Sequence, residues 1–275
     1  MNKKLLAVLL IAFTLLLAAC GKSDDGVIKV GTTTSEAPTW NLVKDLAKEE
    51  GIELEVIKID DYVKPNIALD EGEIDINAFQ TVVYFDNFIK ERDLDLSAIG
   101  TTNIWPMGIY SKKVDNINDL KDGDQIIIPN DPTNLGRALL LLEKAELIKL
   151  KDDFDGTGGV ENIVENPKNF EITPVAAGQT ARGLDDAAAS VINSDMAINA
   201  GLNPTKESIF REDSSNKAYI NIIAAKTDRK DDEDFAKIVE IYHSEEVSSF
   251  IEEHFNGAAV PVKEPVSFLE DYKQN

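Results

Sequence analysis

The chain has 275 residues and is strongly acidic, with 50 Asp and Glu against 28 Lys and Arg and a formal net charge of -22. Such a surface repels nucleic acid and anionic lipid head groups, so neither is expected as a partner. Hydrophobic residues make up 43% of the chain, as in an ordinary globular protein. With a single cysteine, Cys20, the chain cannot form an internal disulfide and must depend on its core.

The first residues have the pattern of an export signal. Lys3 and Lys4 supply a positive start, residues 5–19 are apolar except for Thr14, and small residues precede Cys20. Because this apolar run is short for a bilayer-spanning helix, residues 1–19 are predicted to be a cleaved signal peptide. A cysteine directly after the cleavage point resembles the lipobox of bacterial lipoproteins, whose thiol is acylated. An ordinary signal peptide with an incidental cysteine is the alternative.

Lipidation of Cys20 would fix the location of the protein. Each buried methylene contributes about 0.8 kcal/mol, so two or more acyl chains anchor a protein durably. The polar residues 21–26 reach at most roughly 20 Å. Residues 20–26 are therefore predicted to be a lipidated tether that holds the folded part at the extracytoplasmic face of the cell membrane.

Apolar periodicity after the tether predicts alternating strands and helices. In the first part of the chain, strands are expected at 27–30, 52–59 and 73–77, and helices at 38–50, 63–71 and 82–92. This β-α-β-α-β order predicts a largely parallel sheet covered by helices.

The same alternation resumes after Pro106. Further strands are expected at 125–129, 170–175, 187–192 and 219–225, and helices at 136–146 and 235–255. The last helix is predicted to be one long amphipathic element. Two α/β units in a chain of this size suggest two lobes rather than one sheet.

No pattern in the sequence indicates catalysis or metal binding. His243 and His254 are distant on one predicted helix with no cysteine nearby, and there is no nucleophile elbow or P-loop. Residues 153–156 resemble the middle of an EF-hand loop, but Lys151 occupies the first ligand position. The chain is expected to be non-enzymatic and to need no metal or other cofactor.

Arg137 is the first candidate for ligand binding. It follows Gly136 near the start of an apolar helix, where a glycine would let a ligand come close and an arginine could hold a carboxylate through two hydrogen bonds. A surface or ion-pairing arginine is an equal alternative.

Three asparagines at the ends of predicted strands are further candidates. Asn77 and Asn193 follow strands, and Asn221 lies near the start of another. Open α/β sheets bind ligands at strand ends, and an amide offers both a donor and an acceptor to a zwitterion. For each of them, an ordinary turn residue is the alternative.

Several motifs occur in a fixed order along the mature chain, at residues 62–69, 75–80, 106–111, 128–139, 165–169, 200–204 and 221–223. The most specific is Asn-Asp-Pro-Thr-Asn-x-Gly-Arg, at residues 130–137. Together they resemble the methionine-binding (NlpA-type) lipoprotein family, whose members are the substrate-binding components of ABC importers.

The resemblance implies a periplasmic-binding-protein-like α/β fold, in which two lobes close over a ligand in the cleft between them. By this analogy the first lobe comprises residues 27–104 and 225–275, and the second comprises residues 105–224. The expected partners are an ABC permease and its ATPase, and the membrane through the lipid anchor.

The resemblance also implies roles for individual residues. Arg137 would hold the ligand carboxylate, and Asn193 and Asn221 would bind its amino and carboxyl groups. Phe79 would line the side-chain pocket. Asn77, at a strand end, and Trp105, at a departure from the family pattern, are also predicted to bind the ligand.

The sequence departs from the family pattern around this pocket. Ala78 and Thr81 stand where methionine-binding members often have tyrosine and histidine. Met196 lies near a frequent aromatic position, and Trp105 lies where an acidic residue is frequent. L-Methionine is the first choice of ligand, and another apolar amino acid or a methionine-containing dipeptide is the alternative. A surface adhesion or interaction lipoprotein with no transport role is the alternative of another class.

Overall fold

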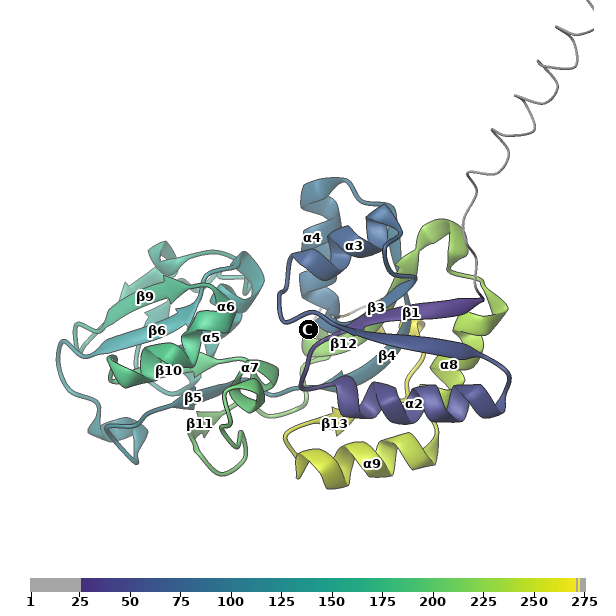
Figure 1. Ribbon diagram of the computed structural model, residues 1–275. Helices are drawn as coiled ribbons and strands as arrows, with labels where there is room; N and C mark the ends of the chain where they lie inside the picture. Colours follow the sequence, from purple (N-terminus) through teal and green to yellow (C-terminus); the bar gives the residue numbers. More distant parts are fainter. Residues whose placement is uncertain (1–25, 271, 273–275) are drawn as a thin grey trace, which may run out of the picture.

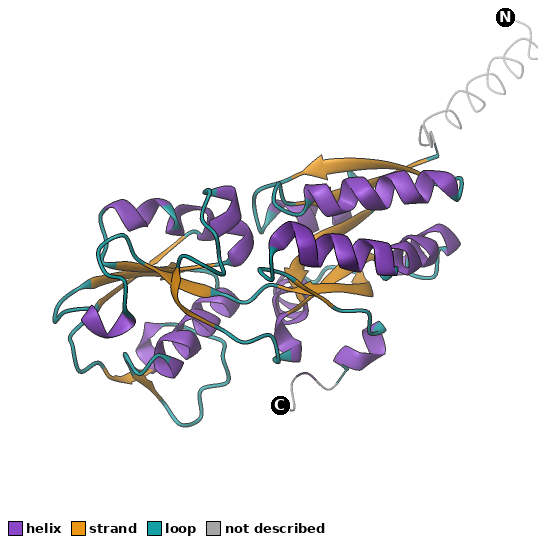
Figure 2. Cartoon of the chain, turned by 90° about the horizontal axis from the view of Figure 1, so that it is seen from below, coloured by secondary structure: helices purple, strands orange, loops and turns teal. Residues whose placement is uncertain are grey.

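In the computed structural model the chain folds into two α/β lobes that lie side by side (Figure 1). The structure describes residues 26–270 and residue 272. The predicted signal peptide, the lipidation site Cys20 and nearly all of the tether lie outside the described residues. Extended segments connect the two lobes, as Figure 2 shows from below.

The first lobe contains a six-stranded mixed sheet with the order β13-β4-β12-β3-β1-β2. Its strands are β1 (Val27–Thr32), β2 (Glu53–Lys58), β3 (Ile76–Thr81), β4 (Leu96–Ile104), β12 (Ile220–Lys226) and β13 (Val260–Pro261). The strand β1 pairs in parallel with β2 and β3, as the β-α-β-α-β pattern predicts. The other half is antiparallel, because β12 returns from the second lobe and inserts between β3 and β4.

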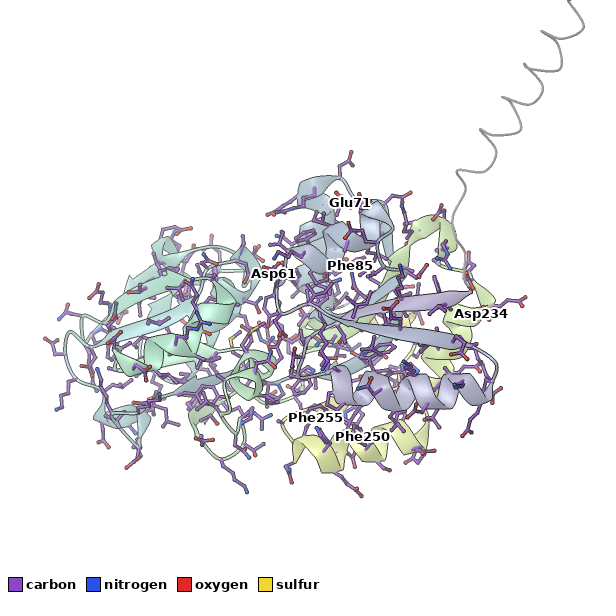
Figure 3. The ribbon with its side chains drawn as sticks, viewed as in Figure 1. Asp61, Glu71, Phe85, Asp234, Phe250 and Phe255 are labelled. Atoms are coloured by element: carbon purple, nitrogen blue, oxygen red, sulfur yellow. The ribbon has the colours of Figure 1, made fainter. Side chains whose placement is uncertain are left out.

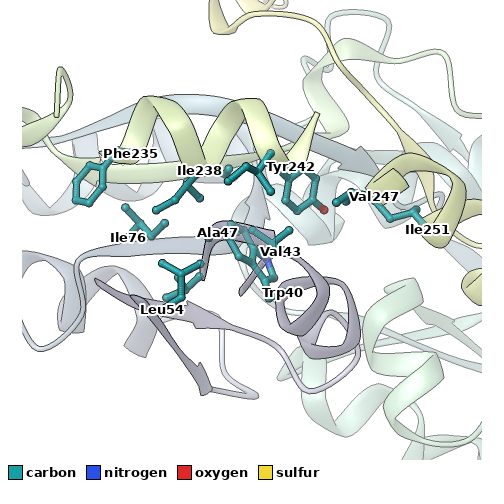
Figure 4. Packing of buried hydrophobic residues seen from close by; sticks show 14 of the residues in the cluster. Trp40, Val43, Ala47, Leu54, Ile76, Phe235, Ile238, Tyr242, Val247 and Ile251 are labelled. Carbon is teal, nitrogen blue, oxygen red and sulfur yellow. The ribbon is translucent and has the colours of Figure 1, made fainter. Parts of the chain in front are cut away.

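Helices cover both faces of this sheet. They are α2 (Ala37–Glu49), α3 (Lys64–Glu71), α4 (Val82–Arg92), α8 (Glu233–Tyr242) and α9 (Glu245–Phe255). On one face, α2, α8 and α9 form an apolar cluster in which the Trp40 and Tyr242 rings lie 5.2 Å apart (Figure 4). On the other face, α3 and α4 contribute Leu69 and Phe85 to a second cluster. Burying a side chain of this size stabilises the fold by about 1.5–3 kcal/mol.

The second lobe has a five-stranded sheet with the order β11-β5-β10-β6-β9. Its strands are β5 (Gly108–Tyr110), β6 (Gln125–Pro129), β9 (Glu171–Val175), β10 (Ala189–Ile192) and β11 (Ser208–Arg211). A small hairpin pairs β7 (Lys149–Leu150) with β8 (Ile163–Glu165). The helices are α5 (Pro132–Lys144), α6 (Ala177–Thr180) and α7 (Ser194–Asn199). Leu139 and Leu142 of α5 are buried in the same apolar cluster as Ile126 and Ile128 of β6.

Short 3-10 helices occur in the loops of both lobes. They span η2 (Ile117–Asp119), η3 (Val160–Asn162), η4 (Arg182–Asp185), η5 (Lys217–Tyr219), η6 (Thr227–Arg229) and η7 (Val266–Leu269). Over the described part of the chain, no helix is both long and apolar enough to cross a bilayer.

Several elements differ from the predictions, among them the strand expected at 73–77, which spans Ile76–Thr81 in the structure. The predicted helix 235–255 is two helices, because the Ser244 side chain accepts a hydrogen bond from the Val247 amide and starts α9. The helix expected from Gly136 begins at Pro132, where Asp131 caps it by accepting from the Asn134 amide. The strand β4 was not predicted, because its sequence, Leu-Ser-Ala-Ile-Gly-Thr-Thr-Asn-Ile, has no clear alternation.

The chain crosses between the sheets twice, from β4 to β5 and from β11 to β12. Because all of β12 pairs with β3 or β4, the predicted lobe boundary between residues 224 and 225 falls inside a strand. The return crossing comes earlier, between Arg211 and Ile220. We therefore propose residues 27–104 and 220–272 as the first lobe and residues 105–219 as the second.

Gly136 allows a close contact within the second lobe. A Cβ built on this residue would lie 2.0 Å from the backbone oxygen of Gly156. The amide of Gly158 also donates to the carbonyl of Pro132 at 3.2 Å, so this loop packs directly on the first turn of α5. The glycine therefore admits a loop of the protein itself, and the interpretation that it makes room for a ligand is wrong.

We expect Gly136→Ala to lower the free energy of unfolding by about 1–3 kcal/mol, because backbone atoms would have to move apart. Gly178→Ala is the matched control, since a Cβ on that helical glycine meets nothing within 4 Å. Urea denaturation of both variants would measure the difference. Equal stability of the two variants would contradict the packing role of Gly136.

Candidate ligand-binding site

A cavity lies between the two lobes. Its lining residues come from β3, α4 and β12 of the first lobe, from α5 and α7 of the second, and from the connecting segments. They are Tyr62, Phe79, Gln80, Thr81, Tyr84, Trp105, Asn134, Arg137, Asn193, Ser194, Asp195 and Asn221. Five of the six residues predicted to bind ligand, Arg137, Asn193, Asn221, Phe79 and Trp105, are therefore brought together here.

Asn77 lies elsewhere, contrary to the expectation. It is fully buried, and its amide donates to the side chain of Asn66 at 2.9 Å and to the carbonyl of Pro65 at 3.2 Å. It also accepts from Gln80 at 3.0 Å. This network ties the start of α3 to β3, so Asn77 supports the cavity wall instead of lining it.

Sequence reasoning missed much of the aromatic wall. Tyr62, Phe79 and Tyr84 form a cluster with ring centroids 6.0–6.3 Å apart. The hydroxyl of Tyr84 donates to the backbone carbonyl of Tyr62 at 2.7 Å, which orients the Tyr84 ring. Tyr62 belongs to a motif that the sequence analysis identified, but periodicity cannot place this loop residue beside β3.

Trp105 lies on the segment that connects β4 of the first lobe to β5 of the second. Its ring packs edge-on against Phe255 of α9, at a centroid distance of 4.8 Å. Phe255 is labelled in Figure 3, on the part of the first lobe that lies toward the second. The indole therefore continues the apolar core of the first lobe up to the cavity.

Arg137 is 3% exposed and is already paired within the protein. Its Nε and Nη2 donate to the Glu212 carboxylate at 2.9 Å and 2.6 Å, and Nη2 also donates to the Trp105 carbonyl at 2.8 Å. The ring of Tyr219 lies 4.0 Å from the guanidinium carbon. These bonds occupy the two-pronged grip predicted for a ligand carboxylate and leave Nη1 as the nitrogen available to a ligand.

Asn193 and Asp195 stand side by side at the end of β10. The Asn193 amide donates to Asn134 at 2.8 Å, but its carbonyl oxygen is buried without a hydrogen bond from any described residue. Asp195 is 5% exposed, and its Oδ1 accepts from the Tyr62 hydroxyl of the other lobe at 2.7 Å. Its Oδ2 is buried and has no such partner.

The pKa of Asp195 is raised to about 6. Burial is the main cause, and the hydrogen bond from Tyr62 opposes it. The sequence analysis did not identify Asp195, although it directly follows the Asn193-Ser194 strand end.

Glu36 is a second buried carboxyl close to this site. It precedes α2, is 1% exposed, and neither of its carboxyl oxygens has a hydrogen-bond partner among the described residues. Burial and the nearby charge of Asp195 raise the pKa of Glu36 to about 8. Trp105 and Asn221 lie near enough to lower this pKa somewhat, but not in full hydrogen-bond geometry.

Direct hydrogen bonds also join the lobes around the cavity. Asn199 donates to Asp60 at 3.1 Å, and Arg211 donates to the carbonyls of Gly257 and Ala258 at 3.0 Å. With the bond from Tyr62 to Asp195, they hold the lobes together in a closed arrangement. Within the described ranges, no group of His, Cys, Asp and Glu side chains is placed to hold a metal ion.

The sequence matches the family described as NlpA lipoprotein over residues 28–263. The chain belongs to the NlpA lipoprotein family. The D-methionine-binding lipoprotein MetQ of Salmonella typhi is 45% identical over 253 residues, which cover 90% of this chain and 93% of that protein.

Solved structures agree with this assignment. Protein PG110 from Staphylococcus aureus is 41% identical with a TM-score of 0.87, covering 90% of this chain and 98% of that one. A nutrient binding protein from Burkholderia cenocepacia, bound to methionine, is 42% identical with a TM-score of 0.82 and covers 85% and 99%. The two-lobed binding-protein fold predicted for this NlpA family member is confirmed.

Two of the four departures from the family pattern, Thr81 and Trp105, line the cavity of this NlpA lipoprotein. Thr81 lines it, and its hydroxyl accepts from the Tyr84 amide at 3.3 Å to cap α4. Ala78 and Met196 are buried but do not belong to the lining. The departures at Thr81 and Trp105 therefore alter the cavity lining, and the aromatic cluster of Tyr62, Phe79 and Tyr84 remains.

A double-mutant cycle would test the Arg137–Glu212 pair. Arg137→Met leaves a buried carboxylate without its cation, and Glu212→Gln leaves a buried guanidinium without its anion. We expect each to lower the free energy of unfolding by about 3–5 kcal/mol, and the double variant to lose much less than the sum. Urea denaturation measures all three, and additive losses would show that the pair is not coupled.

The pH dependence of stability would test Glu36. Because its pKa is raised on folding, from 4.5 to about 8, the native state binds the proton more tightly than the unfolded state. The contribution of Glu36 to stability is thus fully present below pH 4.5 and is lost as the pH rises to about 8, by at most about 1.4 kcal/mol per pH unit.

We expect Glu36→Gln to flatten the curve of unfolding free energy against pH between pH 6.5 and 8, where Asp195 is already ionised. Denaturant unfolding at several pH values measures this. Glu49→Gln, an exposed position on the same helix, is the control and should leave the curve unchanged. A wild-type curve that rises over this range would contradict the assignment.

Proposed function

We propose that this chain is a lipid-anchored, extracytoplasmic binding protein that captures methionine and delivers it to an ABC importer. The observation that supports this most strongly is the cavity between the lobes, in a member of the NlpA lipoprotein family. The cavity has an aromatic wall and a polar wall, as an amino acid with an apolar side chain requires. The Burkholderia relative of the same fold is bound to methionine.

Each wall of the cavity has a proposed role. Phe79, with Tyr62 and Tyr84, surrounds the thioether side chain, because sulfur–aromatic contacts are favourable. Asn193 and Asn221 bind the amino and carboxyl groups, and Arg137 contributes Nη1 to the carboxylate. Trp105 takes part in closing the cavity. L-Methionine is the first choice, and the name of the Salmonella relative makes D-methionine the necessary comparison.

Transport would follow from closure of the lobes. A ligand that contacts both walls favours the closed state, and the permease with its ATPase would recognise that state. Acylated Cys20 would keep the protein beside the permease at the membrane surface. The named relatives are binding proteins, and we propose that this chain likewise performs no catalysis.

Thermal unfolding of a soluble form starting at Gly21, refolded to remove bound ligand, would test the ligand. At a concentration a thousandfold above the dissociation constant, a ligand adds about 4 kcal/mol of stability. For a protein of this size we expect an increase in Tm of roughly 8–16 °C with L-methionine. D-Methionine, the other amino acids and Gly-Met complete the panel.

Two variants distinguish an effect on ligand binding in the cavity from an effect on the stability of the fold. Phe79→Leu and Phe88→Leu both shorten a buried aromatic of the same cluster, but only Phe79 lines the cavity. We expect only Phe79→Leu to reduce the increase in Tm caused by methionine. An increase in Tm with another compound alone would keep the binding function but assign a different ligand. No increase with any compound would favour the adhesion or interaction lipoprotein.

A further inference from the structure

We propose that Asp195 and the carbonyl oxygen of Asn193 form a subsite for the protonated amine of the ligand, and that this amine, more than the carboxylate, determines which compounds bind. The inference rests on the proposed function of the cavity and adds the chemical class that it selects. The class consists of ligands with a free ammonium group, whether or not their carboxylate is free.

The first argument is that two buried hydrogen-bond acceptors of the cavity lack a donor. Asp195 and Asn193 both line the cavity and are at least nine-tenths buried. The Oδ2 of Asp195 and the Oδ1 of Asn193 receive no hydrogen bond of full geometry from the described residues, and the backbone amides of Asp195 and Met196 lie only near enough to lower the pKa of Asp195 somewhat. A buried acceptor without a donor is costly, and a ligand ammonium brings three donors and the matching charge.

The second argument is the balance of charge. The only cation among the lining residues is Arg137, and Glu212 already neutralises it at 2.6 Å. Neither Asp195 nor Glu36 forms a salt bridge within the described part of the chain. The cavity therefore favours a cation over an anion.

The protonation states agree with a single ammonium group. Burial raises the pKa of Asp195 to about 6 and that of Glu36 to about 8. Of the two, Glu36 thus holds its proton more tightly, and Asp195 is the carboxyl that lines the cavity. The Tyr62 hydroxyl keeps the Asp195 carboxyl oriented from the opposite lobe.

Isothermal titration of the refolded mature protein with three compounds would test the inference. L-Methionine has both charged groups, L-methioninamide keeps the ammonium alone, and 4-(methylthio)butanoate keeps the carboxylate alone. We expect methioninamide to bind within about tenfold of methionine, and 4-(methylthio)butanoate to bind at least about thirtyfold more weakly.

The variant Asp195→Asn would then test whether the preference for an ammonium group comes from the charge of Asp195. The new amide oxygen still accepts from Tyr62, so the bond between the lobes is kept while the charge is lost. We expect methionine and methioninamide to lose at least about tenfold in affinity and the butanoate to lose none. Asp60→Asn is the matched control, because Asp60 also joins the lobes through Asn199 but does not line the cavity. It should leave the ranking of the compounds unchanged.

The variant Tyr62→Phe distinguishes the effect of the Asp195 charge from the effect of the hydrogen bond that joins the lobes at this residue. It removes the hydrogen bond from Tyr62 to Asp195 but keeps the carboxylate. The affinities of all three compounds should therefore fall by a similar factor. If 4-(methylthio)butanoate binds as tightly as methionine, this inference is wrong and the proposed function stands. The same conclusion follows if Asp195→Asn lowers the affinity of all three compounds equally. If none of the three compounds binds, both the proposed function and this inference are wrong.

Discussion

The buried pair of Arg137 and Glu212 is the interaction on which the arrangement of the cavity depends. Arg137 comes from α5, and Glu212 lies on the return connection, directly after β11. Glu212 also accepts from the Met107 amide at 2.7 Å and donates its own amide to the Met107 carbonyl at 3.0 Å, while Arg137 binds the Trp105 carbonyl. One ion pair therefore joins both connecting segments to the helix that lines the cavity. A buried pair costs desolvation, so its value here lies in specifying one geometry.

This pairing changes the electrostatics of the ligand site. With Arg137 neutralised, the ionisable groups that remain close to the cavity are the carboxyls of Glu36 and Asp195, which lie on different lobes. Both groups are buried in this closed arrangement, and burial raises the pKa of each. On the proposed role of Asp195, a cationic group of a ligand would relieve that cost. The same groups can therefore bind the ligand and couple its binding to closure.

Particular residues show how far sequence reasoning can go. The helix over residues 82–92 and the strand over residues 125–129 were predicted with the bounds that the structure has, because their apolar spacing agrees with their tertiary environment. The break at Ser244 was missed because an amphipathic pattern continues across a cap without interruption. The strand β4 was missed because its stability comes from pairing with β12, a partner more than a hundred residues away.

The sequence by itself determined the two α/β units, the family through its ordered motifs, and five of the lining residues. The α/β units follow from local spacing, whereas the family and several of the lining residues follow from the resemblance of the motifs to a known family. Only the tertiary structure decided that Arg137 is paired with Glu212, that Asn77 supports the wall, and that Asp195 faces Tyr62 across the cavity. Each of these contacts joins residues that the chain brings together by crossing between sheets or folding back on itself. Periodicity reports which face of an element is buried, but it does not report what that face meets.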